Sequence, residues 1–200
     1  RILIAASGTG GHIYPALSLA DSLSNCWEIQ WLGVPNRLEI ELVPKKYNLT
    51  TLKVEGLQGS ILRKIFALIK LLFASIKVSR LLRQKKINVI FTTGGYISAP
   101  SILGAKLIGI PILMHESNAI PGKVTRHLGR FCDHIALGIP LASTYLPGCK
   151  TSFTGTPVRS GFLVEQPLPS WVPSGNGKLI VIMGGSQGAK KLNEMVRVIL

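Results

Sequence analysis

The residues best suited to do chemistry lie in a glycine-rich stretch near the start of the chain. Residues 2–6 are small or apolar, Ser7-Gly8-Thr9-Gly10-Gly11-His12 follows them, and an amphipathic run then starts at Pro15. We interpret this order as a buried strand, a tight turn and a helix, with Pro15 in the first helical turn, where its missing N–H costs nothing. Such a turn directs backbone N–H groups and the positive end of a helix dipole at its ligand, which favours an anion such as a phosphate.

A single glycine-rich turn also fits a strand-to-helix connection that binds nothing, and the spacing here is not the GxGxxG dinucleotide fingerprint. Three further stretches with glycine or polar residues follow predicted strands: Gly94-Gly95-Tyr96, Glu116-Ser117-Asn118 and Arg159. Short apolar strands that alternate with helices predict an α/β domain with a parallel sheet covered on both faces. Because the loops beyond the carboxyl ends of parallel strands meet at one crevice, we expect these four stretches to lie together.

The charge balance indicates an anionic partner. The chain has 23 Lys and Arg against 9 Asp and Glu, a formal net charge of +14. Nucleic acid is the usual partner for such an excess, but few Tyr or Trp accompany the cations, and no basic tail or zinc-finger spacing occurs. The three scattered cysteines favour free thiols in a reducing compartment. The chain contains no Asp-x-Asp metal-binding motif, and we expect no cofactor.

Residues 61–86 have helical periodicity and contain no Gly or Pro. One sector of this helix collects five side chains that we expect to face the core: Ile65, Leu68, Ile69, Leu72 and Ile76. Another face carries cations with two rings among them: Arg63, Lys70, Lys77 and Arg80, with Phe66 and Phe73. Rings among cations predict a helix that lies on an anionic membrane surface, and the alternative is a surface helix whose rings pack under a loop. Five basic residues between Arg63 and Arg80 are too many for a transmembrane span.

The end of the chain predicts the start of a second domain. Residues 165–177 contain three prolines and two glycines and have no periodicity, which is typical of a linker. A strand over 178–183, a glycine turn over 184–189 and a helix over 190–200 are expected to follow. We therefore predict a domain over 1–162, a linker over 163–177 and the first unit of another domain over 178–200. The chain begins at Arg1, without a signal peptide, and stops inside a periodic segment, so both ends look cut.

Five motifs in order give the sequence a close resemblance to the MurG family of bacterial N-acetylglucosaminyltransferases, over essentially all 200 residues. They are Gly8-Thr9-Gly10-Gly11-His12, Thr93-Gly94-Gly95-Tyr96, His115-Glu116-Ser117-Asn118, Gly155-Thr156-Pro157-Val158-Arg159 and Gly184-Gly185-Ser186-Gln187-Gly188-Ala189. Ser117 stands where many relatives have Gln, and Thr156 where many have Asn. Ser117 could therefore change a contact beside Asn118.

The resemblance implies a GT-B fold, which has two Rossmann-like domains on either side of a cleft. It implies UDP-N-acetylglucosamine and lipid I as substrates, no nucleic acid partner, and a peripheral location on the cytoplasmic face of the bacterial plasma membrane. The donor contacts it implies are Thr9, Gly10, Gly11, Asn118, Arg159 and Ser186. The acceptor diphosphate is expected at Gly10, Gly11, Gly94, Gly95, Tyr96 and Ser98.

The implied reaction is an inverting transfer of N-acetylglucosamine to the 4-hydroxyl of the N-acetylmuramyl residue of lipid I, which needs a base for that hydroxyl. His12 is the candidate base, because the dipole at a helix start disfavours the imidazolium. Glu116 is a weaker candidate that could instead orient Asn118. The alternatives are a related GT-B enzyme that glycosylates diacylglycerol, a non-catalytic membrane-binding module and a nucleic-acid binder. Because most of the donor half is absent, we expect these 200 residues alone to have little transferase activity.

Overall fold

The computed structural model describes residues 1–23, 27–54, 61–172, 175, 177–184 and 189–199, with the side chains of 61–64 and 198–199 excepted. The chain divides into two compact units, residues 1–163 and 164–200. The boundary falls one residue beyond the predicted end of the first domain.

The first unit is built on a fully parallel sheet, as the alternation of apolar strands and helices predicts. Its strands are β1 (Ile2–Ala5), β2 (Ile29–Gly33), β3 (Asn48–Thr51), β4 (Val89–Thr92), β5 (Ile112–Glu116), β6 (His134–Leu137) and β7 (Thr151–Phe153). The order across the sheet is β3-β2-β1-β4-β5-β6-β7. From β1 the chain moves outward to β3, returns to β4 on the other side of β1, and then moves outward in the opposite direction. The direction of winding therefore switches between β1 and β4.

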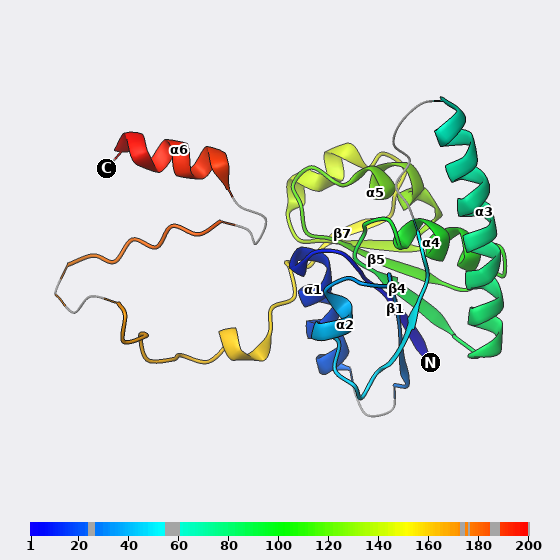
Figure 1. Cartoon of the computed structure of the whole chain (residues 1–200), viewed down its shortest axis with the longest axis horizontal. Coiled ribbons are helices and arrows are strands. Elements are labelled where there is room, and N and C mark those ends of the chain that lie inside the picture. Colours follow the sequence, from blue (N-terminus) through cyan, green and yellow to red (C-terminus); the bar gives the residue numbers. More distant parts are fainter. Residues whose placement is uncertain (24–26, 55–60, 173–174, 176, 185–188, 200) are drawn as a thin grey trace. The chain divides into compact units, whose positions relative to one another are not determined.

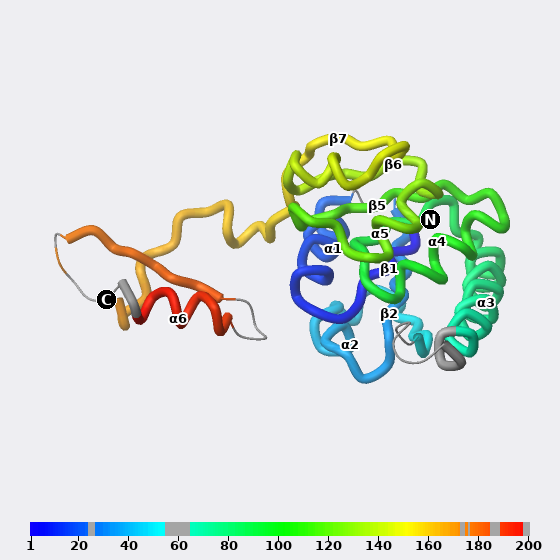
Figure 2. Tube along the Cα trace, turned by 90° about the horizontal axis from the view of Figure 1, so that it is seen from above, coloured from blue at the N-terminus to red at the C-terminus, as the bar shows by residue number. Residues whose placement is uncertain are grey.

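Helices cover both faces of this sheet (Figures 1 and 2). One face is covered by α1 (Gly10–Ser22) and α2 (Glu39–Leu42), and the other by α3 (Ile61–Gln84), α4 (Ser98–Lys106) and α5 (Lys123–Leu128). Three short 3-10 turns follow later in the unit: η1 (Gly129–Phe131), η2 (Pro140–Tyr145) and η3 (Ser160–Phe162). Along β1, Ile2 and Ile4 belong to the core under α1, while Leu3 and Ala5 belong to the core under α3 and α4. Strands buried on both faces explain why β1 is a continuous apolar run.

Helix α1 begins at Gly10, so the expectation that Pro15 lies in the first helical turn was wrong. The early start is possible because Gly8, with φ +104°, reverses the chain directly after β1. Pro15 instead lies buried inside the helix, where its missing N–H leaves the carbonyl of Gly11 without its helical partner.

Helix α3 forms as predicted, but its predicted core face was wrong. The buried side chains of the helix are Ala74, Ser75, Val78 and Leu82, all in its second half. Four of the five side chains expected in the core are 46% to 58% exposed, and these are Ile65, Leu68, Ile69 and Leu72. Helix α4 has only 9 residues and packs beside the second half of α3, so no described helix covers the first half (Figure 1). Apolar residues occur around the whole first half of α3, so periodicity alone selected the wrong sector.

The second unit contains the helix α6 (Lys190–Ile199), as predicted. The strand expected over 178–183 is not formed, because these residues have no regular secondary structure and their side chains are exposed. A strand is stable only beside another strand, and the described part of this unit supplies none. The described residues between 164 and 177 form neither a helix nor a strand.

The contact between α3 and α4 depends on the small size of Gly104. A Cβ atom at this position would lie 2.7 Å from the carbonyl oxygen of Ser75 and 3.1 Å from the amide nitrogen of Ser79, both in the backbone of α3. We expect Gly104→Ala to lower the free energy of unfolding by about 1–3 kcal/mol, because backbone atoms cannot move aside as a side chain can. Urea unfolding measures this loss.

The matched control is Gly161→Ala, because a Cβ atom there meets nothing within 4 Å and the residue has no positive φ. The control is expected to unfold at the wild-type urea concentration. A Gly104→Ala protein as stable as the control would contradict the close contact between the two helices.

Candidate functional site

The turn after β1 presents the amino end of α1 to the carboxyl edge of the sheet. The carbonyl of Thr9 accepts hydrogen bonds from the N–H groups of His12 and Ile13, at 3.0 and 3.1 Å. No described residue accepts a hydrogen bond from the N–H of Gly10 or Gly11. These are the first two helical amides, which have no acceptor within a helix. Together with the helix dipole, they form a position that favours an anion.

The buried carboxylate of Glu39 holds this turn in place through a hydrogen bond. Its side chain is fully buried, and it accepts hydrogen bonds from the N–H of Gly8 at 3.3 Å and of Val34 at 2.6 Å. Glu39 therefore joins the turn after β1 to the turn after β2. Sequence reasoning missed this residue, because the short Glu- and Leu-rich helix around it gives no sign that one carboxylate points inward.

His12 connects the first glycine turn to the second. Its Nδ1 lies 2.7 Å from the carbonyl oxygen of Thr93, and the hydroxyl of Thr93 donates to the carbonyl of His12 at 2.9 Å. Because a carbonyl oxygen only accepts, Nδ1 carries a proton and the neutral ring has its lone pair at Nε2. No described residue bonds to Nε2. This nitrogen is thus available to accept a proton.

The turn after β4 packs directly against the imidazole of His12. Gly94 and Gly95 have φ of +90° and +79°, a conformation that favours glycine at both positions. A Cβ atom on Gly94 would lie 3.4 Å from Cε1 of His12, and one on Gly95 would lie 3.6 Å from its Nε2. Tyr96, the next residue, is exposed. The first and second glycine turns therefore lie together, as the sequence predicts.

Ser98 supports this second turn from inside the protein. The side chain is fully buried, and its hydroxyl donates to the carbonyl of Gly94 at 2.6 Å and is bonded to the hydroxyl of Thr92. The resemblance implied that Ser98 contacts the acceptor diphosphate. In the structure its hydroxyl is turned inward, so its observed contacts shape the turn.

Glu116 organises the loop after β5. One carboxylate oxygen accepts from the backbone N–H and the side-chain amide of Asn118, at 3.0 and 2.8 Å. The other accepts from the N–H of Gly122 at 3.2 Å and the hydroxyl of Thr125 at 2.7 Å. The Thr125 hydroxyl lies 3.7 Å from the Cβ position of Gly94, which brings this loop beside the second glycine turn. Both carboxylate oxygens of Glu116 are therefore engaged in hydrogen bonds, four in all, that hold its own loop in position.

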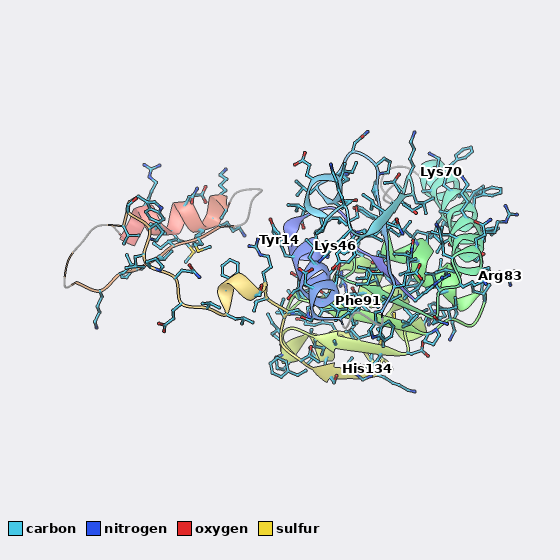
Figure 3. The ribbon with its side chains drawn as sticks, turned by 90° about the horizontal axis from the view of Figure 1, so that it is seen from below. Tyr14, Lys46, Lys70, Arg83, Phe91 and His134 are labelled. Carbon is cyan, nitrogen blue, oxygen red and sulfur yellow. The ribbon has the colours of Figure 1, made fainter. Side chains whose placement is uncertain are left out.

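Arg159 reaches the same edge of the sheet through Tyr14 on α1. The guanidinium carbon lies 4.1 Å from the centre of the Tyr14 ring, and the Tyr14 ring in turn lies against Gly10. The hydroxyl of Ser18 donates to the carbonyl of Val158 at 2.5 Å and fixes the segment that carries Arg159. Figure 3 shows Tyr14 on the opposite side of the domain from Lys70. All four stretches expected at the crevice therefore contact one another directly or through one side chain.

The site contacts of two predicted residues lie outside what the structure describes. Ser186 is not among the described residues, and neither is the side chain of Arg63. Within the described part of the chain, no three or more His, Cys, Asp or Glu residues are grouped so that they could hold a metal ion.

His115 joins the end of β5 to the segment after β7. Its side chain is buried, its Nε2 donates to the carbonyl of Gly155 at 3.1 Å, and its Nδ1 lies 3.2 Å from the hydroxyl of Ser117. Burial lowers the pKa of His115 below its usual value of 6.5. As the pH falls, the unfolded chain therefore binds a proton at His115 at a higher pH than the folded protein does.

This lowered pKa predicts a loss of stability in mild acid. The stabilisation is complete above about pH 6.5 and falls as the pH drops from there toward the folded-state pKa, because only the unfolded chain gains the proton. We expect His115→Gln to be less stable than the wild type at pH 7.5 and to lose less stability between pH 7.5 and 5. Exposed His127, changed to Gln, is the matched control for urea unfolding across this range. Equal pH slopes for the two variants would contradict the buried neutral imidazole.

A family model described as the glycosyltransferase family 28 N-terminal domain matches residues 2–137. The chain is 80% identical over 200 residues to the UDP-N-acetylglucosamine--N-acetylmuramyl-(pentapeptide) pyrophosphoryl-undecaprenol N-acetylglucosamine transferase of Prochlorococcus marinus strain NATL1A, covering 100% of this chain and 57% of that protein. It is 60% identical to the protein of the same name from Synechococcus sp. strain CC9902, covering 100% of this chain and 56% of that protein. The chain therefore spans little more than half the length of these relatives.

Solved structures show the same fold. MurG of Acinetobacter baumannii superposes with a TM-score of 0.67 and 29% identity, over 84% of this chain and 50% of that one. A UDP-glucosyltransferase from Polygonum tinctorium superposes with a TM-score of 0.55 at 10% identity, over 84% of this chain and 55% of that one, which shows the fold alone. The architecture is thus that of the first domain of GT-B glycosyltransferases, as the sequence predicts. The chain belongs to glycosyltransferase family 28, and its residues 2–137 form the N-terminal domain of that family.

Proposed function

We propose that this chain is the acceptor-binding half of an enzyme that transfers N-acetylglucosamine from UDP-N-acetylglucosamine to lipid I and forms lipid II for peptidoglycan. The observation that carries this proposal is the meeting of two glycine-rich turns around His12. The name of the relative that is 80% identical over 200 residues supports the choice of substrates. Both substrates carry a diphosphate, and the open amides of Gly10 and Gly11 suit such a group.

In the proposed reaction, Nε2 of His12 takes the proton from the 4-hydroxyl of the N-acetylmuramyl residue. The freed oxygen attacks C1 of the donor sugar, the bond from C1 to the diphosphate breaks, and UDP leaves with the electron pair. The hydrogen bond from Nδ1–H to Thr93 supports this role, because it leaves the lone pair at Nε2. The positive end of α1 lowers the energy of the negative charge that develops on the leaving diphosphate.

The remaining predicted residues divide into binding and positioning roles. We assign the donor to Thr9, Gly10, Gly11, Asn118 and Arg159, with Ser186, and the acceptor diphosphate to Gly10, Gly11, Gly94, Gly95 and Tyr96. Glu116 and Ser98 act as positioning residues in this proposal, because their hydrogen bonds are directed at the loops that carry Asn118 and Gly94. No step in this scheme requires a metal ion.

The part of α3 from its start to Phe73 is the proposed membrane attachment surface. Six apolar side chains on it are 46% to 65% exposed: Ile65, Phe66, Leu68, Ile69, Leu72 and Phe73. The cations Lys70, Lys77 and Arg80 lie on the same helix and are also exposed. Exposed apolar side chains among cations suit the headgroup region of an anionic bilayer. No described helix has both the length and the apolar character needed to cross a bilayer. The exposed rings and cations of α3 lead us to propose peripheral attachment at the cytoplasmic face, where the enzyme would meet the lipid-linked acceptor.

A chimeric enzyme tests the catalytic proposal. In it, this chain replaces the matching residues of the Prochlorococcus marinus NATL1A relative, which supplies the remaining length. We expect the chimera to convert lipid I and UDP-N-acetylglucosamine to lipid II, and His12→Gln to lower kcat by about 100-fold or more with little change in KM for the donor. His127→Gln, at an exposed position on α5, is the matched control. A His12→Gln chimera within about tenfold of its parent would remove His12 as the base, and an inactive parent chimera would contradict the proposed reaction.

Vesicle binding tests the attachment surface. We expect Phe66→Ala with Phe73→Ala to weaken binding to vesicles of phosphatidylglycerol and phosphatidylcholine by roughly tenfold or more, because each ring loses apolar area buried in the headgroup region. Phe153→Ala is the matched control, since Phe153 is 62% exposed on the edge strand β7 and lies far along the chain from α3. Co-sedimentation with vesicles measures the change. Equal binding by the double variant and the control would contradict attachment through α3.

A further inference from the structure

A second feature of α3 lies outside the site described above. An open groove of about 300 Å3 runs between the second half of α3 and the edge strand β3. It is lined by Leu32, Thr50, Thr51, Leu52, Lys77, Val78, Arg80, Leu81 and Gln84. None of these residues touches the glycine turns in any contact that the structure shows, so the proposed transfer reaction does not use the groove.

The lining of the groove matches an anion that carries an apolar part. Lys77 and Arg80 supply positive charge from the helix, and Thr50, which lies on the same face of the sheet as Leu32 and Leu52, supplies a hydroxyl group from the strand. Among the described residues, no carboxylate pairs with Lys77 or Arg80 and no acidic residue lines the groove. The rest of the lining is mostly aliphatic. A phosphodiester would satisfy the two cations and the hydroxyl of Thr50, while a glycerol backbone or the first carbons of an acyl chain would cover the aliphatic floor.

The position of the groove along α3 favours a membrane source for this anion. Phe66, Phe73 and Arg80 recur every seven residues and so lie in one stripe, with a drift of about 20° per heptad. Lys77 follows Phe73 by one helical turn, a rise of about 6 Å. The exposed rings therefore lead along the helix directly to the two cations of the groove. A bilayer that covers the rings would bring its headgroups to the level of Lys77 and Arg80.

We propose that the groove between α3 and β3 binds the phosphodiester headgroup of an anionic membrane phospholipid, with Lys77 and Arg80 on the phosphate and the hydroxyl of Thr50 as a hydrogen-bond donor. This inference rests on the membrane attachment proposed above and adds a defined lipid site to it. A single saturable site fixes how α3 sits on the membrane, whereas a diffuse positive surface does not.

The test uses a soluble lipid, so that binding to the groove is separated from attachment to a bilayer. Dihexanoyl-phosphatidylglycerol is titrated, below its micelle concentration, into residues 1–200 labelled with 15N. We expect saturable one-to-one shifts of the amide signals of Thr50, Thr51 and Leu52. Dihexanoyl-phosphatidylcholine and inorganic phosphate are expected to cause no saturable shift there at the same concentrations.

Lys77→Gln with Arg80→Gln is expected to weaken this binding at least tenfold. The matched control is Arg83→Gln with Lys85→Gln, which removes the same charge from two exposed positions near the end of α3 that do not line the groove (Figure 3 labels Arg83). Retained shifts in the control show that the loss comes from the groove rather than from net charge. Unchanged amide signals in the core strands show that both variants remain folded.

Three results would overturn the lipid site: no saturable shift at Thr50 to Leu52, equal weakening by the control pair, or saturation by inorganic phosphate alone, which indicates a site for small anions. The failure of this inference is distinguishable from the failure of membrane attachment. Vesicle binding that still depends on Phe66 and Phe73 leaves the attachment surface intact while the groove is rejected. Saturable binding of the soluble lipid, with vesicle binding indifferent to the two rings, retains the groove and rejects the attachment surface.

Discussion

The candidate site depends on one constraint, the pairing of β1 with β4 in the middle of the sheet. These strands are hydrogen-bonded neighbours, with Ala5 opposite Thr92, although more than eighty residues separate them in the chain. The chain leaves their carboxyl ends in opposite directions, so the two turns open a crevice between them. The hydrogen bond from Nδ1–H of His12 to Thr93 spans this switch point and sets both the orientation and the tautomer of the imidazole. Without this pairing, the two glycine turns would have no reason to meet.

A layer of buried polar side chains holds the turns in place. Glu39 accepts from the first turn, Ser98 donates to the second, and Glu116 accepts from the third, while His115 fixes the segment that leads to Arg159. Among the described residues, no buried side-chain nitrogen or oxygen lacks a hydrogen-bond partner. Buried polar groups cost stability unless they are satisfied, so this layer stabilises one arrangement of the loops over others. The residues that face the crevice can then be small, because the buried polar side chains behind them determine their positions.

Helix α3 joins two different environments in one continuous element. Its second half packs through Ala74, Val78 and Leu82 against the core, and Gly104 allows the backbones of α3 and α4 to approach closely. Its first half is even richer in aliphatic residues but has no described neighbour to bury them. An exposed apolar surface of this kind indicates an interaction site, and the cations beside it indicate an anionic partner. The packed half anchors the exposed half, so a rigid domain carries both the rings and the groove that we propose for membrane contact.

The sequence by itself determined the order and type of the elements in the first unit. Apolar runs set off by glycine turns predicted the strands, and the alternation with helices predicted a parallel sheet whose polar loops meet at one edge. It also indicated that His12, Gly94, Gly95 and Asn118 lie in turns after strands at this edge, because glycine and polar residues after strands are a local signal. Only the tertiary structure decided which face of α3 is buried, because that depends on the length of α4, which is remote in the chain. The roles of Glu39 and Ser98 were likewise set by long-range packing, which no local pattern records. The strand expected over 178–183 has the same explanation. The local pattern favours a strand, but a strand forms only where folding supplies a neighbour to pair with it.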